Sequence, residues 1–259
     1  MKVKTMKTIK FNHNGKTLQV GYLLTVDSAK TKKGEKLGVL TGILYLNNRV
    51  DNKLFCPSST DACRAPCLIG AGQLGIIRGV TATTSRALLF VHDLEQFLAR
   101  LKLEIAVLVN KARSMRYTPA LRLNGTSDVP WEHEKYGEVI QWAKSNYPDL
   151  QVYDYTKIPG RAISDPEIYN VTFSWSGNNL KQCNYFLSKG VNVAVPFDLS
   201  KKQPLPDEFL GYPVIDGDLH DLRFLDPRGV VVGLRYKHSF DGPSKGRKMI
   251  KNDTFLVTA

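Results

Sequence analysis

The sequence lacks any run that approaches the roughly 20 consecutive apolar residues required to cross a bilayer. Its first ten residues, MKVKTMKTIK, are dotted with lysine and lack the apolar segment of a signal peptide. No linker, low-complexity tract or internal repeat divides the chain. These absences argue against a membrane-spanning or secreted protein. We expect a single domain, residues 1–259, in the cytoplasm, and the hydrophobic content of 42% is sufficient for a buried core.

Acidic residues are scarce relative to basic ones. Thirty-six Lys and Arg residues stand against 24 Asp and Glu residues, which gives a formal net charge of +12. This balance favours a polyanionic partner, above all a nucleic acid. The basic residues are scattered and form no basic amphipathic helix, which argues against binding to a membrane surface. The alternative is a basic soluble enzyme whose charge only aids solubility.

Cysteine is also rare, with four residues, and the short C-x2-C spacing of common zinc fingers is absent. Cys56, Cys63 and Cys67 instead stand at C-x6-C-x3-C in CPSSTDACRAPCLIGAGQLG. Three thiols cannot all pair, and a cytoplasm keeps them reduced, so the cluster predicts a soft metal, either zinc or an iron–sulfur cluster. Cys183 or a histidine could be a fourth zinc ligand, although a lone cysteine in LKQCNYF is more typical of a core. The alternative is that the three cysteines are buried and structural.

The glycines after the cysteines, Gly70, Gly72 and Gly75, spell G-x-G-x-x-G. The dinucleotide-binding fingerprint requires a preceding strand, and here a cysteine loop with two prolines precedes the glycines. We therefore expect tight backbone turns beside a metal site or near a substrate phosphate.

The pattern of apolar residues predicts an α/β fold. Residues 1–50 are expected to form a β-rich N-terminal cap with a hairpin turn at Asn14-Gly15, and residues 51–80 form the cysteine and glycine loop. From Thr81 to Met115, apolar spacing of three and four predicts one long amphipathic helix or a broken pair. Residues 81–259 form the body, whose strand-like runs alternate with helical or proline-rich segments. These runs are ALRLNG, QVYDYT, YNVTFSWS, VNVAVPF, VID and VVVGLRY. They favour a parallel sheet or an irregular (β/α) barrel, and we expect the barrel-like form.

Polar side chains follow the predicted strands, and in such folds the chemistry gathers at the carboxyl ends of strands. Asp128 in RLNGTSDVPWE is the first candidate, with Asn124 and Ser127 beside it. The alternative is that Ser127 or Asp128 caps a helix over VPWEHEKYGEVI. Arg122, within its strand run, needs an anionic partner if it points inward.

Other runs supply further candidates. Asp216 and Asp218 in VIDGD form a second carboxylate group, for which a surface turn is the alternative. Asp154 and Lys157 in YDYTK form a third, in which the lysine contacts a phosphate or pairs with the aspartate. The remaining candidates for substrate binding are Ser174 and Ser176 in FSWSG, which strand alternation directs to one side, and Arg235 in the last run.

The segments CPSSTDACRAPCL, RLNGTSDVPWE, VNVAVPF and VIDGDLHDLRFLDPRGVVVGLR together resemble a phage-encoded family of three-cysteine proteins, from about residue 50 to the C-terminus. That family is similar to tRNA-guanine transglycosylases, whose phage members place 7-deazaguanine bases into DNA. The resemblance implies a DNA-modifying glycosyltransferase of the host cytoplasm, with DNA and a free 7-deazaguanine base as substrates. The transglycosylases carry their zinc cysteines late in the chain, before a histidine. Here the cluster is early, so zinc ligation does not follow from the motif alone.

Base exchange at a nucleoside uses one carboxylate that attacks C1′ of the sugar and another that moves the proton of the departing or entering base. We expect Asp128 to be one of these carboxylates, with Asp216 or Asp218 opposite. The target base must be flipped out or single-stranded. Two other functions stay open: an iron–sulfur (radical S-adenosylmethionine-like) enzyme that uses the three cysteines, and a non-catalytic, zinc-stapled nucleic-acid-binding protein.

Overall fold

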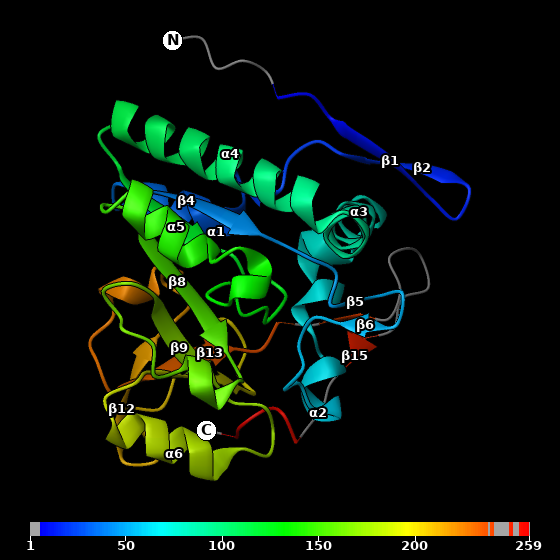
Figure 1. Cartoon of the computed structure of the whole chain (residues 1–259). Helices are drawn as coiled ribbons and strands as arrows, with labels where there is room; N and C mark the ends of the chain where they lie inside the picture. Colours follow the sequence, from blue (N-terminus) through cyan, green and yellow to red (C-terminus); the bar gives the residue numbers. More distant parts are fainter. Residues whose placement is uncertain (1–5, 238, 241–248, 251–253, 259) are drawn as a thin grey trace. The chain divides into compact units, whose positions relative to one another are not determined.

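The computed structural model describes residues 6–237, 239–240, 249–250 and 254–258, and Figure 1 shows the course of the chain. The chain divides into two compact units. The first comprises Met1–Phe55 and Arg78–Val152, and the second comprises Cys56–Ile77 and Tyr153–Ala259. This division into compact units does not test whether the chain folds as one domain, so the expectation of a single domain stays a prediction.

The first unit contains most of the N-terminal half. Its described strands and helices are β1 (Ile9–His13), β2 (Lys16–Val20), β3 (Leu24–Thr25), α1 (Ala29–Glu35), β4 (Val39–Leu44), β5 (Arg49–Val50), β6 (Lys53–Leu54), α3 (Ile77–His92), α4 (Leu94–Ser114), β7 (Thr118–Arg122), the 3-10 helix η3 (Glu134–Tyr136) and α5 (Val139–Asn146). The first residue of α3, Ile77, is assigned to the second unit.

The predicted N-terminal hairpin is confirmed. β1 and β2 pair antiparallel, with His13 opposite Lys16. Both turn residues have positive φ, 48° at Asn14 and 71° at Gly15. A two-residue turn of this hand matches the twist of the strands, and asparagine and glycine tolerate it best.

The helical segment predicted from Thr81 to Met115 belongs to two consecutive helices, which is one of the two forms that its apolar spacing indicated. α3 ends at His92 and α4 begins at Leu94. Asp93 lies between them and caps α4, because its Oδ1 accepts a hydrogen bond from Gln96 N at 3.0 Å. An aspartate in this position satisfies a backbone N–H that a helix start otherwise leaves open.

β4 is a buried sheet strand that the sequence analysis did not identify. All six residues of VLTGIL are buried, and β4 pairs parallel with β7 and antiparallel with β3. α4 packs against both β4 and β7, as Figure 1 shows. The helix approaches closely at Gly42, where a Cβ would lie 2.8 Å from Leu108 Cδ2.

A buried ion pair joins α4 to the start of β3. Arg100 Nε donates to Glu104 Oε1 at 2.6 Å, and both side chains are at most 8% exposed. The Glu104 carboxylate also accepts the backbone N–H groups of Leu23 and Leu24, at 2.8 to 3.0 Å. A buried charge is tolerated when it is paired and hydrogen-bonded in this way.

The second unit contains the cysteine segment and the C-terminal half. Its described elements are α2 (Asp61–Arg64), the 3-10 helices η1 (Leu68–Gly70), η2 (Gly72–Gly75), η4 (Pro159–Arg161) and η5 (Arg223–Leu225), α6 (Leu180–Ser188), and the strands β9 (Asn170–Ser174), β10 (Val193–Phe197), β11 (Glu208–Phe209), β12 (Tyr212–Asp216), β13 (Val231–Arg235), β14 (Ser239–Phe240) and β15 (Met249–Ile250).

The division of the chain passes through β8 (Gln151–Thr156). Its first two residues pair parallel with β7, and its last four pair parallel with β9. The hydrogen-bonding order of the sheet is β11-β12-β13-β10-β9-β8-β7-β4-β3, in which β3 and β11 are antiparallel to their neighbours. The mixed α/β fold and all six predicted strand runs are therefore confirmed. Within the described residues the order ends at β3 and β11, so closure into a barrel is not confirmed.

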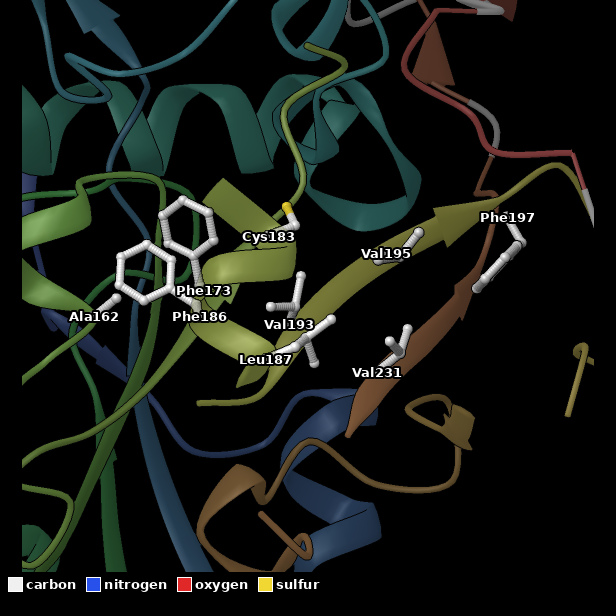
Figure 2. Packing of buried hydrophobic residues seen from close by; sticks show 9 residues of the cluster. All are labelled: Ala162, Phe173, Cys183, Phe186, Leu187, Val193, Val195, Phe197 and Val231. Atoms are coloured by element: carbon white, nitrogen blue, oxygen red, sulfur yellow. The ribbon is translucent and has the colours of Figure 1, made fainter. Parts of the chain in front are cut away.

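The core of the second unit lies between α6 and the sheet. Cys183, Phe186 and Leu187 are buried at helical spacing on α6, which packs against β9 and β10. Phe186 meets Phe173 of β9 with ring centroids 4.4 Å apart, and Val193 of β10 extends the same cluster (Figure 2). Burial of each large apolar side chain contributes about 1.5 to 3 kcal/mol, so this layer is the main stabilising contact of α6.

The glycines of the G-x-G-x-x-G segment lie in or between the short helices η1 and η2, which follow α2 rather than a strand. The structure thus agrees with the rejection of a dinucleotide fingerprint. Among the described residues, no helix combines the length and the apolarity that a membrane span requires.

Candidate functional site

The loop after β7 is organised around the side chain of Asn124, which is 2% exposed. Its Oδ1 accepts hydrogen bonds from Ser127 Oγ at 2.9 Å and from Val129 N at 2.9 Å. The same oxygen accepts the indole N–H of Trp131 at 3.2 Å, and Asn124 Nδ2 donates to Val129 O at 3.0 Å. Arg122 is buried at the end of β7, and its Nη2 donates to Asn124 O at 3.5 Å. Asn124 and Ser127, expected to bind substrate, hold the shape of the loop through these bonds.

Two further residues fix this loop to the segment that follows β4. Gly125 N donates to Leu44 O at 2.9 Å, and Thr126 Oγ1 donates to Leu46 O at 2.6 Å. A Cβ on Gly125 would lie 2.6 Å from Tyr45 Cδ1 and 2.8 Å from Leu44 O. Such contacts are too short for any side chain, so glycine is required here.

Asp128 is a buried carboxylate in this loop, with 5% of the residue exposed. Its backbone N–H donates to Phe55 O at 2.8 Å, which fixes the main chain that carries the side chain. The alternative role as a helix cap is wrong, because the next helix begins at Glu134 and is capped by His133, whose Nδ1 accepts from Lys135 N at 3.1 Å. Asp128 thus occupies a fixed place after the carboxyl end of a parallel strand, where α/β folds place their reactive groups.

Asp154 belongs to a buried chain of polar groups in the second unit. It lies within β8 rather than after it, is 0% exposed, and accepts a hydrogen bond from the hydroxyl of Tyr169 at 2.7 Å. That hydroxyl accepts from Arg161 Nη2 at 2.8 Å, and Arg161 Nη1 lies 3.4 Å from Thr156 Oγ1. Tyr169 and Arg161 were not predicted as site residues: Arg161 lies in the link between two strand runs, and Tyr169 is the first residue of the run YNVTFSWS. The role of Lys157 stays a prediction.

Asp216 and Asp218 meet Arg235 of the neighbouring strand β13. Arg235 Nη1 donates to both carboxylate oxygens of Asp216 at 2.9 Å, and Arg235 N donates to Asp218 Oδ2 at 2.9 Å. Lys237 Nζ lies 3.1 Å from the other oxygen of Asp218, and Arg235 Nε donates to Gln203 O at 2.8 Å. Arg235, a candidate for substrate binding, therefore pairs with these two carboxylates.

The charge state of Asp218 follows from these partners. Burial alone raises the pKa of the Asp218 carboxyl, but the Arg235 backbone N–H, Lys237 and the Arg235 guanidinium outweigh it, and the net pKa lies below its ordinary value. A carboxyl held in the ionised form is a poor proton donor at neutral pH. These contacts form a bracket between β12 and β13, and the catalytic role of Asp216 and Asp218 stays a prediction.

Ser174 and Ser176 lie at the end of β9, where asparagine side chains hold the backbone. Asn179 Oδ1 accepts from Ser176 N at 2.8 Å, and Asn179 Nδ2 donates to Ser174 O at 3.0 Å. Ser176 Oγ donates to Asn178 Oδ1 at 3.2 Å. Thr60 of the cysteine segment donates its hydroxyl to Ser176 O, so this segment is attached to the end of β9 within the second unit.

The three candidate metal ligands are half-buried cysteines of the second unit. Thr60 Oγ1 accepts from Cys63 N at 3.1 Å and so caps the short helix α2. Among the described residues, the one group of three possible metal ligands with converging donor atoms does not contain these cysteines, and their metal site stays a prediction. Cys183 is 0% exposed and burial raises its pKa to about 12, which agrees with a core role.

The three carboxylate groups therefore offer different chemistry. Asp218 stays ionised between cations, and Asp154 shares a proton-bearing hydrogen bond with a phenol. Asp128 is buried on a rigid loop that the structure does not tie into a helix cap. Asp128 lies in the first unit and the other carboxylates lie in the second, and the expected pairing of Asp128 with Asp216 or Asp218 stays a prediction.

Comparison with known sequences gives one match. The sequence model of the family described as Gene product 88 matches residues 22–252. This range covers the loop after β7, the cysteine segment and every strand from β3 to β13. No curated protein and no solved structure matches the chain.

Proposed function

The chain belongs to the Gene product 88 family, a family of phage proteins, and on this premise we propose that it is a DNA-modifying enzyme that exchanges guanine for a 7-deazaguanine base. The observation that carries the proposal is Asp128, a buried carboxylate fixed on a loop after the carboxyl end of β7. The net charge of +12 supports a polyanionic substrate. The segments that resemble phage members of the transglycosylases supply the reaction class.

The proposed reaction has two steps. The carboxylate of Asp128 attacks C1′ of the deoxyribose, the bond from C1′ to N9 of guanine breaks, and the guanine leaves with a proton on nitrogen. The entering 7-deazaguanine then attacks C1′ through its own ring nitrogen, loses the proton there, and releases the carboxylate. No oxidant or reductant is consumed, because one glycosidic bond replaces another.

A second group must supply and recover the proton. We propose Asp216 or Asp218 for this role, as the sequence does. Asp154, which accepts a hydrogen bond from the hydroxyl of Tyr169, is compared with them in the experiments below. The base must leave the stack to react, so a flipped or single-stranded guanine is the expected substrate form.

The direct test is base exchange on DNA. Purified protein is incubated with DNA and isotopically labelled guanine or 7-deazaguanine base, and the nucleosides are then analysed by mass spectrometry. We expect Asp128→Asn to lose at least about 100-fold in rate, a typical effect for a covalent or acid–base residue. The matched control is Asp149→Asn, because Asp149 is an exposed carboxylate in the same unit that pairs with Arg113. Full exchange by Asp128→Asn, with native far-ultraviolet circular dichroism, would overturn the mechanism.

Asp216→Asn and Asp218→Asn, made separately, test which carboxylate transfers the proton. The variant that lacks this group should have a lower rate and a changed pH profile, whereas loss of a residue that only braces the fold would leave the pH profile unchanged. Asp154→Asn is the comparison, because it removes a buried carboxylate that accepts a hydrogen bond from Tyr169. Full exchange by both Asp216→Asn and Asp218→Asn would exclude this pair from the role.

We also propose a structural zinc ion on Cys56, Cys63 and Cys67. Their position in one short segment supports it, and no catalytic step is assigned to the ion. Metal analysis of protein purified without oxygen tests the proposal. We expect the zinc content to fall by one per chain when serine replaces all three cysteines. A loss of iron and sulfide instead would favour the iron–sulfur enzyme, and a serine form with unchanged zinc and iron content would refute both.

A further inference from the structure

Two histidines and an aspartate from three separate elements converge in the first unit. His13 ends β1, Asp51 lies in the turn between β5 and β6, and His92 ends α3. His92 Nε2 lies 2.7 Å from Asp51 Oδ2, and His13 Nε2 lies 3.5 Å from Asp51 Oδ1. In the described part of the chain, this is the one group of three or more potential metal ligands whose donor atoms all lie within 4.8 Å of one another.

The spacing of the donor atoms is close to that of a metal site. In tetrahedral coordination, zinc bonds of 2.0 to 2.2 Å to nitrogen and oxygen place neighbouring ligand atoms about 3.3 Å apart. The distance of 3.5 Å from His13 Nε2 to Asp51 Oδ1 is close to this value. The distance of 2.7 Å from His92 Nε2 to Asp51 Oδ2 is shorter, so these two side chains must move slightly apart to bind an ion. The imidazole rings have centroids 4.8 Å apart, so both can turn toward one ion.

The environment leaves the site open to an ion and to water. The side chains are 17% exposed at His13, 37% at Asp51 and 46% at His92. Asn14 Nδ2 lies 3.1 Å from His13 Nε2 and is a further polar neighbour of the group. Neutral imidazole is the form in which histidine binds a metal.

We propose that His13, Asp51 and His92 bind a divalent transition-metal ion, with water in the remaining position. Two imidazoles and one carboxylate form a donor set that suits zinc and its neighbours in the first transition series, and not magnesium or calcium, which prefer oxygen ligands. The ion ties the N-terminal hairpin and the β5–β6 turn to the end of α3. The site is separate from the cysteine segment and does not depend on the proposed base exchange.

The experiment uses cobalt(II) as a spectroscopic probe and zinc(II) as competitor, with the full chain in two forms. One form is wild type, and the other has serine in place of Cys56, Cys63 and Cys67, which removes thiolate ligands. We expect both forms to bind cobalt with visible d–d bands, and the serine form to do so without a thiolate-to-cobalt charge-transfer band. Zinc should displace the cobalt, and a large excess of magnesium should not.

Single substitutions identify the ligands. His13→Gln and His92→Gln, made in the serine form, should each weaken zinc binding by at least about tenfold, a conservative loss for a ligand because even outer-shell changes cost 10- to 100-fold. His133→Gln is the matched control, since His133 caps η3 in the same unit and lies outside the cluster. Binding that is absent from the serine form, or that survives both ligand substitutions, overturns the proposal.

Discussion

Replacement of Asn124 by alanine tests whether one amide holds the loop that carries Asp128. Asn124 is 2% exposed, and its Oδ1 accepts from Ser127 Oγ, Val129 N and the indole of Trp131. Alanine removes this acceptor and also the Nδ2 donor to Val129 O. The serine hydroxyl can rotate to another acceptor, but the backbone N–H of Val129 and the indole N–H of Trp131 cannot.

The expected cost follows from those two donors. Val129 is 4% exposed and Trp131 is 0% exposed, so water does not replace the lost acceptor without rearrangement of the loop. A buried donor left without a partner costs about 1 to 3 kcal/mol, which gives a total of about 4 kcal/mol for the two. A protein of this size unfolds with about 5 to 15 kcal/mol, so the substitution removes a large part of the stability. The corresponding decrease in Tm is about 10 °C.

The assay is urea unfolding followed by tryptophan fluorescence and by circular dichroism, with base exchange measured in parallel. Asn146→Ala is the control, because Asn146 is exposed and donates a single bond to Trp142 O at 2.8 Å. It should change the free energy of unfolding by less than about 0.5 kcal/mol. A loss below about 1 kcal/mol in Asn124→Ala would refute the role of the amide as the centre of the loop.

Three further predictions follow from buried groups elsewhere. Glu104→Ala should cost about 3 to 5 kcal/mol in urea unfolding, because the buried charge of Arg100 loses its carboxylate and the backbone N–H groups of Leu23 and Leu24 lose their acceptor. Asp149→Ala at an exposed ion pair should cost less than about 1 kcal/mol. Equal costs would contradict this. Cys183 should resist iodoacetamide at pH 8 in the native protein and react after denaturation, since burial raises its pKa to about 12; native labelling seen by peptide mass spectrometry would disprove it. Burial also raises the pKa of the Asp226 carboxyl to about 6, although Arg223 opposes the shift. The folded state therefore binds the carboxyl proton more tightly than the unfolded state does. The resulting contribution to the free energy of unfolding is fully present below about pH 4 and is lost as the pH rises through 6. Asp226→Asn should flatten the pH dependence of unfolding in that window, and an unchanged slope would argue against the shift.

Much of the fold could be predicted from local patterns. The hairpin at Asn14-Gly15 and the six strand runs were found because turn chemistry and apolar runs are properties of short segments. The break between α3 and α4 also had a local signal, since Asp93 stands three residues before Gln96, as an N-cap residue does. β4 was missed because its buried apolar run stood inside a region that the hairpin pattern had defined as a cap. Sheet closure depends on strand order, which no local pattern encodes.

The candidate site, like the fold, could be predicted only where the signal is local. The rule that reactive groups follow parallel strands located Asp128, Asp216 and Asp218. It gave no information on their charge, because Arg235 reaches Asp216 only through the parallel pairing that sets Asp216 beside Gly233. The neighbouring positions of β12 and β13 in the sheet bring these residues together, and no local pattern gives that order. Tyr169, the hydrogen-bond partner of Asp154, begins a predicted strand run, but nothing in that run indicated which side chain it would meet.

The same reasoning explains why the two metal proposals differ in origin. Cysteine spacing predicts ligands that lie on one segment, and Cys56, Cys63 and Cys67 were found in that way. His13, Asp51 and His92 belong to a strand, a turn and a helix, so no spacing rule connects them, and only the fold brings their donor atoms within 4.8 Å of one another. Proximity in the folded chain is the stronger requirement for coordination, since a metal ion tolerates errors of only about 0.2 Å in its bond lengths. If one of the two sites binds zinc at low concentration, the physical expectation is that the histidine site does so with less movement of the chain.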